Sequence, residues 1–222
     1  MSDPLVPGIG GILSADIAVP EHERQVGFYS RVLTTGQNPL WREDLSNNVG
    51  TPIVGLGPRS AEYEHLPLQW MPHIQVADVA ASVKRALDLG GKALMLDSKH
   101  QWAVLCDPNG AAFGMIPVVS EEAVLPADGA PASVGHIAWL DLTVSDASAT
   151  RDFYRQVVNW SVQEVDMGDA SEPYADYIML GGDGRPAAGV RHARGVNANL
   201  PTVWMIHLPV GDLAESVRRV RA

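Results

Sequence analysis

The side chains best suited to chemistry are two carboxylates and two imidazoles that recur in repeated stretches of the sequence. Asp16 of the segment DIAV recurs as Asp141 of DLTV, and His73 of WMPH recurs as His207 of WMIH. A carboxylate that orients an imidazole and supports its protonated form is an arrangement for acid–base catalysis. The same two groups form a weak metal site unless further donors join them, or they hydrogen-bond to each other as a structural pair. The sequence leaves these three interpretations open.

The stretches that carry these residues form two pairs of internal repeats. DIAVPEHERQVGFYSRVL, which starts at Asp16, recurs as DLTVSDASATRDFYRQVV at a constant offset of 125 residues. WMPHIQVADVAASVKR, which starts at Trp70, recurs as WMIHLPVGDLAESVRR at an offset of 134, with nine identities in sixteen positions. In each stretch an alternating apolar pattern predicts a strand, an acidic residue suits a helix N-terminus, and a helical period follows. The repeated unit is therefore a strand followed by a helix.

The two kinds of repeat also resemble each other, so we predict four units. They lie at about 11–66, 68–118, 134–192 and from 202 onwards. Short strands with turn signals follow the helices, including a hairpin that turns at Asp107 to Gly110. Residues 89–117 of the second unit would map beyond Ala222, so we expect the fourth unit to be incomplete.

The four units pair into two predicted domains. A chain of 222 residues exceeds the roughly 100 to 200 residues of one domain. We expect the first domain over residues 1–119, a linker over 120–133, and the second domain over 134–222.

The composition limits the partners and the compartment. Hydrophobic residues make up 46% and charged residues 19%, which is typical of a globular protein. The net charge of −10, with no stripe of Lys and Arg, argues against nucleic acid. No apolar run approaches the ~20 residues that span a bilayer, and the segment MSDPLVPGIGG does not resemble a signal peptide. The single Cys106 fits a reducing compartment. We therefore expect a cytoplasmic monomer or homodimer that meets a small molecule and no membrane.

Four β-α-β-β-β units paired into two domains, with FY in the first helix and DPNGAAFG closing a domain, resemble the vicinal oxygen chelate superfamily. That superfamily includes glyoxalase I, bleomycin-resistance proteins and extradiol dioxygenases. The segment from Trp139 to Tyr154, WLDLTVSD with RDFY, is most similar to its tandem glyoxalase-like subgroup. The resemblance implies an α+β fold whose curled mixed sheets form clefts for a substrate and, in the enzymes, a divalent metal.

The resemblance also implies where metal ligands would stand. Family members use a His on the first strand of a unit and a Glu after DPxG. The corresponding positions here are Ser14, Met71, Gly114, Trp139 and Met205. None of these side chains suits a divalent cation, which prefers imidazole nitrogen or carboxylate oxygen. We therefore predict no metal site and no cofactor, and we expect these positions to contact a ligand instead.

Strand side chains alternate, so residues two positions further along should face the same clefts. These are Asp16 and His73 in the first domain, and Asp141 and His207 in the second. Trp102 and Trp139 are further candidates for the walls of a pocket, because aromatic side chains often contact flat ligands.

The sequence thus favours a metal-independent glyoxalase-like protein that binds a small organic molecule, by sequestration or with acid–base chemistry of the lyase or oxidoreductase type. A metal-dependent lyase or dioxygenase with a relocated metal site is the first alternative. A structural or regulatory dimer whose clefts are filled by side chains is the second.

Overall fold

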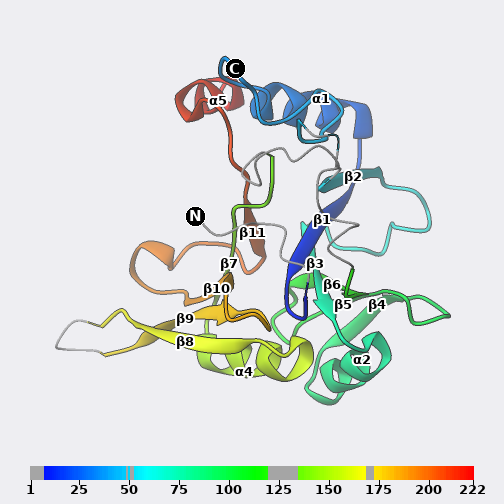
Figure 1. The fold of residues 1–222 in the computed structure, drawn as a ribbon, viewed down its shortest axis with the longest axis vertical. Helices are drawn as coiled ribbons and strands as arrows, with labels where there is room; N and C mark the ends of the chain where they lie inside the picture. The colour runs from blue at the N-terminus through cyan, green and yellow to red at the C-terminus, as the bar shows by residue number, and fades with distance from the viewer. Residues whose placement is uncertain (1–7, 49, 51–52, 120–134, 169–172) are drawn as a thin grey trace.

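The computed structural model describes residues 8–48, 50, 53–119, 135–168 and 173–222 (Figure 1). The expected linker, 120–133, lies outside the described residues. The fold is the expected α+β arrangement of two mixed sheets. No helix among the described residues has the length and apolar character needed to cross a membrane.

The first sheet joins the first two units edge to edge. Its strand order is β2-β1-β3-β6-β5-β4. β1 and β3 pair antiparallel at the centre, while β2 runs parallel to β1 and β6 runs parallel to β3. Each unit therefore closes its first strand with its own last strand. The strands are β1 (Ile12–Val19), β2 (Val54–Pro58), β3 (Met71–Val76), β4 (Lys92–Leu96), β5 (Ala103–Cys106) and β6 (Ala112–Pro117).

The second sheet repeats this pattern in the order β11-β7-β10-β9-β8. β7 pairs antiparallel with β11 and parallel with β10, as β1 does with β3 and β2. The internal repeat of the sequence is thus a repeat of strand pairing. The strands are β7 (Trp139–Val144), β8 (Ser161–Asp166), β9 (Ala175–Leu180), β10 (Pro186–His192) and β11 (Trp204–His207).

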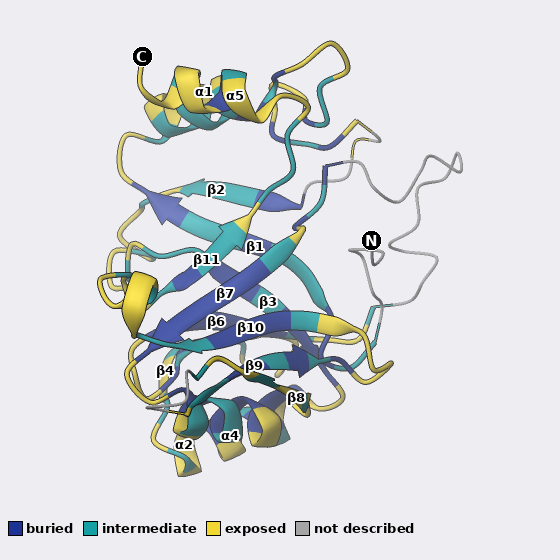
Figure 2. Cartoon of the chain, turned by 90° about the vertical axis from the view of Figure 1, so that its left-hand side faces the viewer, coloured by how far each residue is buried: buried dark blue, intermediate teal, exposed yellow. Residues whose placement is uncertain are grey.

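The helices lie in two pairs at opposite ends of the molecule (Figures 1 and 2). At one end α1 (His22–Leu33) lies beside α5 (Leu213–Val220), and at the other α2 (Val79–Asp88) lies beside α4 (Ala147–Val158). Each pair therefore joins a helix of the first half to one of the second. A short 3₁₀ helix, η1 (Gly195–Asn197), lies between β10 and β11.

The first unit departs from the expected four strands. Between α1 and β2 the described residues contain one isolated bridge, Trp41 with Asn47, in place of a hairpin. Trp41 is 1% exposed and donates its indole N–H to the carbonyl oxygen of Pro209 in the second half. The segment therefore packs against the other half of the molecule and leaves β2 as an edge of its sheet.

The two halves share one hydrophobic core. Phe113 of β6 contacts Phe153 and Tyr154 of α4, with ring centroids 6.2 and 5.3 Å apart. Tyr154 in turn contacts Trp204 of β11 at 5.3 Å. These apolar contacts lie on one face of the first sheet. Because strand side chains alternate between the two faces, the opposite face is available for a cleft.

Candidate functional site

The structure brings together both Asp–His pairs found in the sequence. In the first half, His73 Nδ1 lies 3.5 Å from Asp16 Oδ2. In the second half, His207 Nε2 lies 3.1 Å from Asp141 Oδ2. Each His stands on the strand antiparallel to that of its Asp, in β3 against β1 and in β11 against β7. The antiparallel pairing at the centre of each sheet therefore makes each pair.

The first pair includes a third polar side chain, Ser14. Ser14 is directly opposite His73 in the β1–β3 register, and its Oγ lies 3.0 Å from His73 Nδ1. A proton on Nδ1 suits both neighbours, because the hydroxyl and the carboxylate of Asp16 can accept it. An unprotonated Nδ1 would direct its lone pair at the carboxylate. The contacts therefore favour the tautomer whose proton is on Nδ1.

Two glycines make room for this pair. A Cβ on Gly55, the residue beside Asp16 on β2, would lie 2.1 Å from Asp16 Oδ1. A Cβ on Gly114, beside His73 on β6, would lie 2.1 Å from His73 Cδ2. Gly114 is the position at which the resemblance to the vicinal oxygen chelate superfamily implied a metal-ligating Glu. The imidazole of His73 occupies the space that such a side chain would need.

Burial shifts the pKa values of both residues of the pair, and in each it is the largest cause of the shift. It raises the pKa of Asp16 above its ordinary value, although His73 and the backbone N–H of Gly55 act in the opposite direction. Burial also lowers the pKa of His73, against the attraction of the Asp16 carboxylate. A lowered pKa means that His73 is a neutral base at neutral pH.

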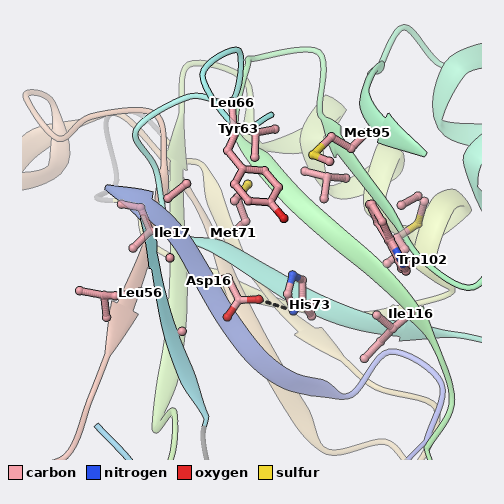
Figure 3. Close-up of a pocket in the computed structure, with 16 residues that line it drawn as sticks. Asp16, Ile17, Leu56, Tyr63, Leu66, Met71, His73, Met95, Trp102 and Ile116 are labelled. Carbon is pink, nitrogen blue, oxygen red and sulfur yellow. Dashed lines mark ion pairs between the residues drawn. The ribbon is translucent and has the colours of Figure 1, made fainter. Parts of the chain in front are cut away.

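A cavity of about 550 Å³ opens over the pair, on the face of the first sheet away from the shared core (Figure 3). All six strands of that sheet contribute to its walls, together with Tyr63 and Leu66 from the segment between β2 and β3. The walls are largely apolar. The lining side chains that carry polar atoms are Asp16, Tyr63, His73 and Trp102.

The residues of the first half that we predicted to contact a ligand fall into two groups. Met71 and Trp102 line the cavity, and Trp102 is 38% exposed. Ser14 and Gly114 lie against the ring of His73. Sequence reasoning did not select Tyr63, Met95 or Leu56. Met95 could have been found from strand alternation, because it pairs with Val104 on the cavity face. Leu56 alternates with Gly55 and Gly57, so alternation directs its side chain to the other face, and Tyr63 lies in a loop and gives no such signal.

In the second pair the carboxylate of Asp141 is enclosed by other side chains, whereas the side chain of His207 is 51% exposed. Asp141 is buried, and its Oδ1 accepts from the indole N–H of Trp139 at 2.8 Å and lies 2.9 Å from Arg191 Nη2. With His207 on Oδ2, both carboxylate oxygens have partners. Met205 faces Asp141 across the β7–β11 register. These contacts satisfy the carboxylate within the protein.

The two halves differ at two equivalent positions. Trp139 occupies the strand position that Ser14 has in the first half, as the repeat offset shows. In the first half, Gly57 of β2 pairs with Ala18 of β1, and in the second half Arg191 of β10 pairs with Thr143 of β7. The repeat offset of 125 residues makes Ala18 and Thr143 equivalent, so Gly57 and Arg191 occupy equivalent positions. The small residues Ser14 and Gly57 leave space over Asp16. The large residues Trp139 and Arg191 fill the corresponding space over Asp141.

The donors in the first cleft do not fit a divalent metal. Ser14, Met71 and Gly114 hold positions at which the family resemblance implied metal ligands, and Asp16 and His73 supply one oxygen donor group and one imidazole. Across the part of the chain that the structure describes, no group of three or more His, Cys, Asp and Glu residues is arranged to hold a metal ion. A stable protein site for zinc takes at least three such ligands.

Comparison with known proteins agrees with this fold. Residues 14–116 match the glyoxalase-like domain family. The anthracycline biosynthesis protein DnrV of Streptomyces peucetius is 29% identical over 159 residues, which are 69% of this chain and 54% of DnrV. The anthracycline biosynthesis protein DauV of Streptomyces sp. (strain C5) is 28% identical over the same shares. The chain thus spans about half the length of the curated relatives it matches.

Solved structures with a similar fold are more distant in sequence. A mutant of 4-hydroxymandelate synthase from Streptomyces coelicolor superposes with a TM-score of 0.55 at 15% identity, over 96% of this chain and 75% of the other. The 2,2',3-trihydroxybiphenyl 1,2-dioxygenase of Sphingomonas wittichii strain RW1 superposes with a TM-score of 0.52 at 11% identity, over 96% and 78%. At these identities the likeness concerns the fold alone.

Proposed function

We propose that this member of the vicinal oxygen chelate superfamily, whose residues 14–116 match the glyoxalase-like domain family, binds a small, flat, largely apolar organic molecule in the cleft of its first sheet, without a metal ion. The observation that carries this proposal is the cavity itself. It has the size of typical small-molecule sites, apolar walls and a few polar groups gathered at one place.

The wall residues suit an aromatic ligand in particular. Tyr63 and Trp102 offer ring faces and edges, and Met71 and Met95 offer polarisable sulfur that packs well against rings. Asp16 and His73 can meet a hydroxyl or carbonyl oxygen of the same molecule (Figure 3).

The names of the curated relatives support the same ligand class. DnrV and DauV are both described as anthracycline biosynthesis proteins. Anthracyclines contain a flat fused-ring system with phenol and quinone oxygens. A molecule of this kind would place its ring surface on the apolar walls and an oxygen near His73.

The proposal can be tested by titrating the protein with alizarin, a flat dihydroxyanthraquinone, and measuring heat or tryptophan fluorescence. We expect saturable binding that a chelator such as EDTA leaves unchanged. The Gly57→Leu variant should weaken binding roughly tenfold or more, because a Cβ at Gly57 meets no atom within 4 Å and the side chain would extend into the cavity.

Gly27→Leu is the matched control. A Cβ at Gly27 also meets no atom within 4 Å, but the residue lies on α1, outside the cavity walls. Its binding should equal that of the unchanged protein. Absence of saturable binding, or equal binding by both leucine variants, would reject the proposal. Loss of binding in EDTA would favour a metal-dependent lyase or dioxygenase with a relocated metal site.

A further inference from the structure

We propose that the first cleft carries out metal-free proton transfer, in which His73 Nε2 removes a proton from the bound molecule and Ser14 and Asp16 act as positioning residues. This inference rests on the proposed function, because it needs a ligand in the same cleft. It adds a reaction class to that function and gives a different role to each of three side chains.

The two ring nitrogens of His73 have different surroundings. Nδ1 has Ser14 Oγ at 3.0 Å and Asp16 Oδ2 at 3.5 Å. Nε2 has no hydrogen-bond partner among the described residues. Figure 3 shows one nitrogen on the side of Asp16 and the other on the side of Tyr63. With the proton held on Nδ1, the free lone pair of Nε2 is available to a molecule in the cavity.

The imidazole is held in a defined place before a ligand arrives. Ser14 and Asp16 contact one edge of the ring, and the backbone of Gly114 lies against the other edge, so closely that no Cβ would fit. A base that is already oriented needs little reorganisation during the reaction. Gly114 is thus part of how the base is positioned.

The second half shows the same two residue types in an arrangement that lacks this property. There, Nε2 is the nitrogen that meets the carboxylate, at 3.1 Å from Asp141 Oδ2. Arg191 at 2.9 Å supplies a permanent positive charge to the same carboxylate. The contrast between the halves therefore assigns the chemistry to the first cleft and a structural role to the second pair.

The surroundings keep His73 in the form of a base. Burial lowers its pKa, so the ring is unprotonated at neutral pH. The other titratable side chains that line the cavity are Asp16, from β1, and Tyr63, from the segment before β3. Asp16 acts to raise the pKa of His73, and removal of its charge should lower that pKa further.

The step requires no oxidant or co-reactant. A C–H or O–H bond of the ligand breaks, its proton moves to Nε2, and its electron pair is delocalised into the conjugated ring system. The imidazolium then returns the proton at another position, or the electron pair expels a leaving group and the imidazolium passes its proton to that group or to water. The substrate class is accordingly a flat, conjugated carbon or oxygen acid, and the net reaction is an isomerisation or an elimination.

A suitable probe is 5-nitrobenzisoxazole, a flat aromatic molecule that reports on any base in an apolar site. Removal of its ring C–H proton forms a nitrile as the N–O bond breaks, and the electron pair ends on a coloured phenolate. We expect the protein to accelerate this elimination. His73→Ala should lower the rate at least about a hundredfold, the usual contribution of a positioned base. His207→Ala, the matched control in the second half, should leave it unchanged.

Two further measurements separate a positioning role from a purely structural one. The rate should rise with pH as His73 loses its proton, and Asp16→Asn should move this rise to lower pH. Binding of the unreactive 3-methyl derivative, measured by calorimetry, should persist in His73→Ala. If the unchanged protein binds this derivative but His73→Ala reacts as fast, proton transfer by His73 is refuted while the binding function stands. If neither the derivative nor alizarin binds, the binding function itself fails.

Discussion

At the scale of single residues, the cleft depends on glycines that lie against functional side chains. A Cβ on Gly114 would lie 2.1 Å from the ring of His73. Gly114→Ala must therefore displace the imidazole or the strand. Overpacking of this kind costs about 1–3 kcal/mol of the free energy of unfolding, and we expect both that loss and weaker alizarin binding. Chemical denaturation and the titration described above measure the two effects.

Gly57→Ala is the control for this prediction, since Gly57 lines the same cavity and a Cβ there meets nothing within 4 Å. Its stability should stay within about 0.5 kcal/mol of the unchanged protein. Equal stability of the two alanine variants would show that His73 does not lie against Gly114 as described.

The Asp16 carboxylate should reduce stability at neutral pH. Burial raises its pKa, so the folded protein holds the Asp16 proton more tightly than the unfolded chain does. The contribution of the protonated Asp16 to the free energy of unfolding is therefore fully present below its unfolded pKa of about 3.8. It is lost as the pH rises through the pKa of Asp16 in the folded protein. Asp16→Asn should therefore be at least as stable as the unchanged protein at pH 7.

The advantage of Asp16→Asn should shrink as the pH falls towards 4, because the unchanged protein then protonates Asp16. Thermal unfolding of both proteins across this range measures the difference. A variant that is clearly less stable at pH 7 would mean that the ion pair with His73 outweighs burial.

At the scale of elements, three of the four α-helices among the described residues begin in the same way. Asp78, Asp146 and Asp212 precede α2, α4 and α5, and each side chain accepts a hydrogen bond from the backbone N–H three residues later. Glu21 precedes α1 in a left-handed conformation, with φ 50°, and its side chain makes no such bond. The acidic residue predicted at each helix start is thus a cap in three repeats only.

Asp78→Ala should therefore lower the free energy of unfolding by about 1 kcal/mol, the usual contribution of an N-cap. Glu21→Ala, at the equivalent position, removes no cap and should cost less than about 0.5 kcal/mol. Denaturant midpoints of the two variants give the comparison. Similar losses for both would indicate that the caps do not explain the stability of these helix starts.

The sequence predicted those features that a repeat period can carry. The offsets of 125 and 134 placed Asp16 with His73 and Asp141 with His207 on paired strands, and the strands lie as predicted. The period does not state which ring nitrogen of each His meets its Asp, because that depends on side-chain rotation. Nor did it reveal that Arg191 occupies the place of Gly57, since these strands follow segments of different length.

At the scale of the whole molecule, the two halves are joined by shared interior contacts. Tyr154 of the second half is buried, and its hydroxyl donates to Asp107 Oδ2 of the first half at 3.4 Å. The same hydroxyl accepts from the indole N–H of Trp204 at 3.2 Å. A common core of this kind makes the halves unfold together.

Tyr154→Phe should leave a single unfolding transition and lower the free energy of unfolding by about 1–2 kcal/mol, because Trp204 and Asp107 lose a buried partner. Tyr29→Phe is the control, as Tyr29 is half-buried and contacts Phe28 and Trp70 through its ring alone. Calorimetry with a second spectroscopic probe tests both points. Two separate transitions would contradict the shared core.

The same comparison of halves predicts how many molecules each chain binds. Internal repetition gives two sheets with one Asp–His pair each, which by symmetry alone would give two sites. Trp139 and Arg191 occupy the second space with large side chains that bind Asp141 directly, so a ligand there would have to take Arg191 away from a buried carboxylate. We therefore expect calorimetric titration with alizarin to give one molecule per chain, and His207→Ala to leave that value unchanged. A stoichiometry of two would show that Arg191 yields its place to a ligand, and that the halves are equivalent in binding despite their different residues.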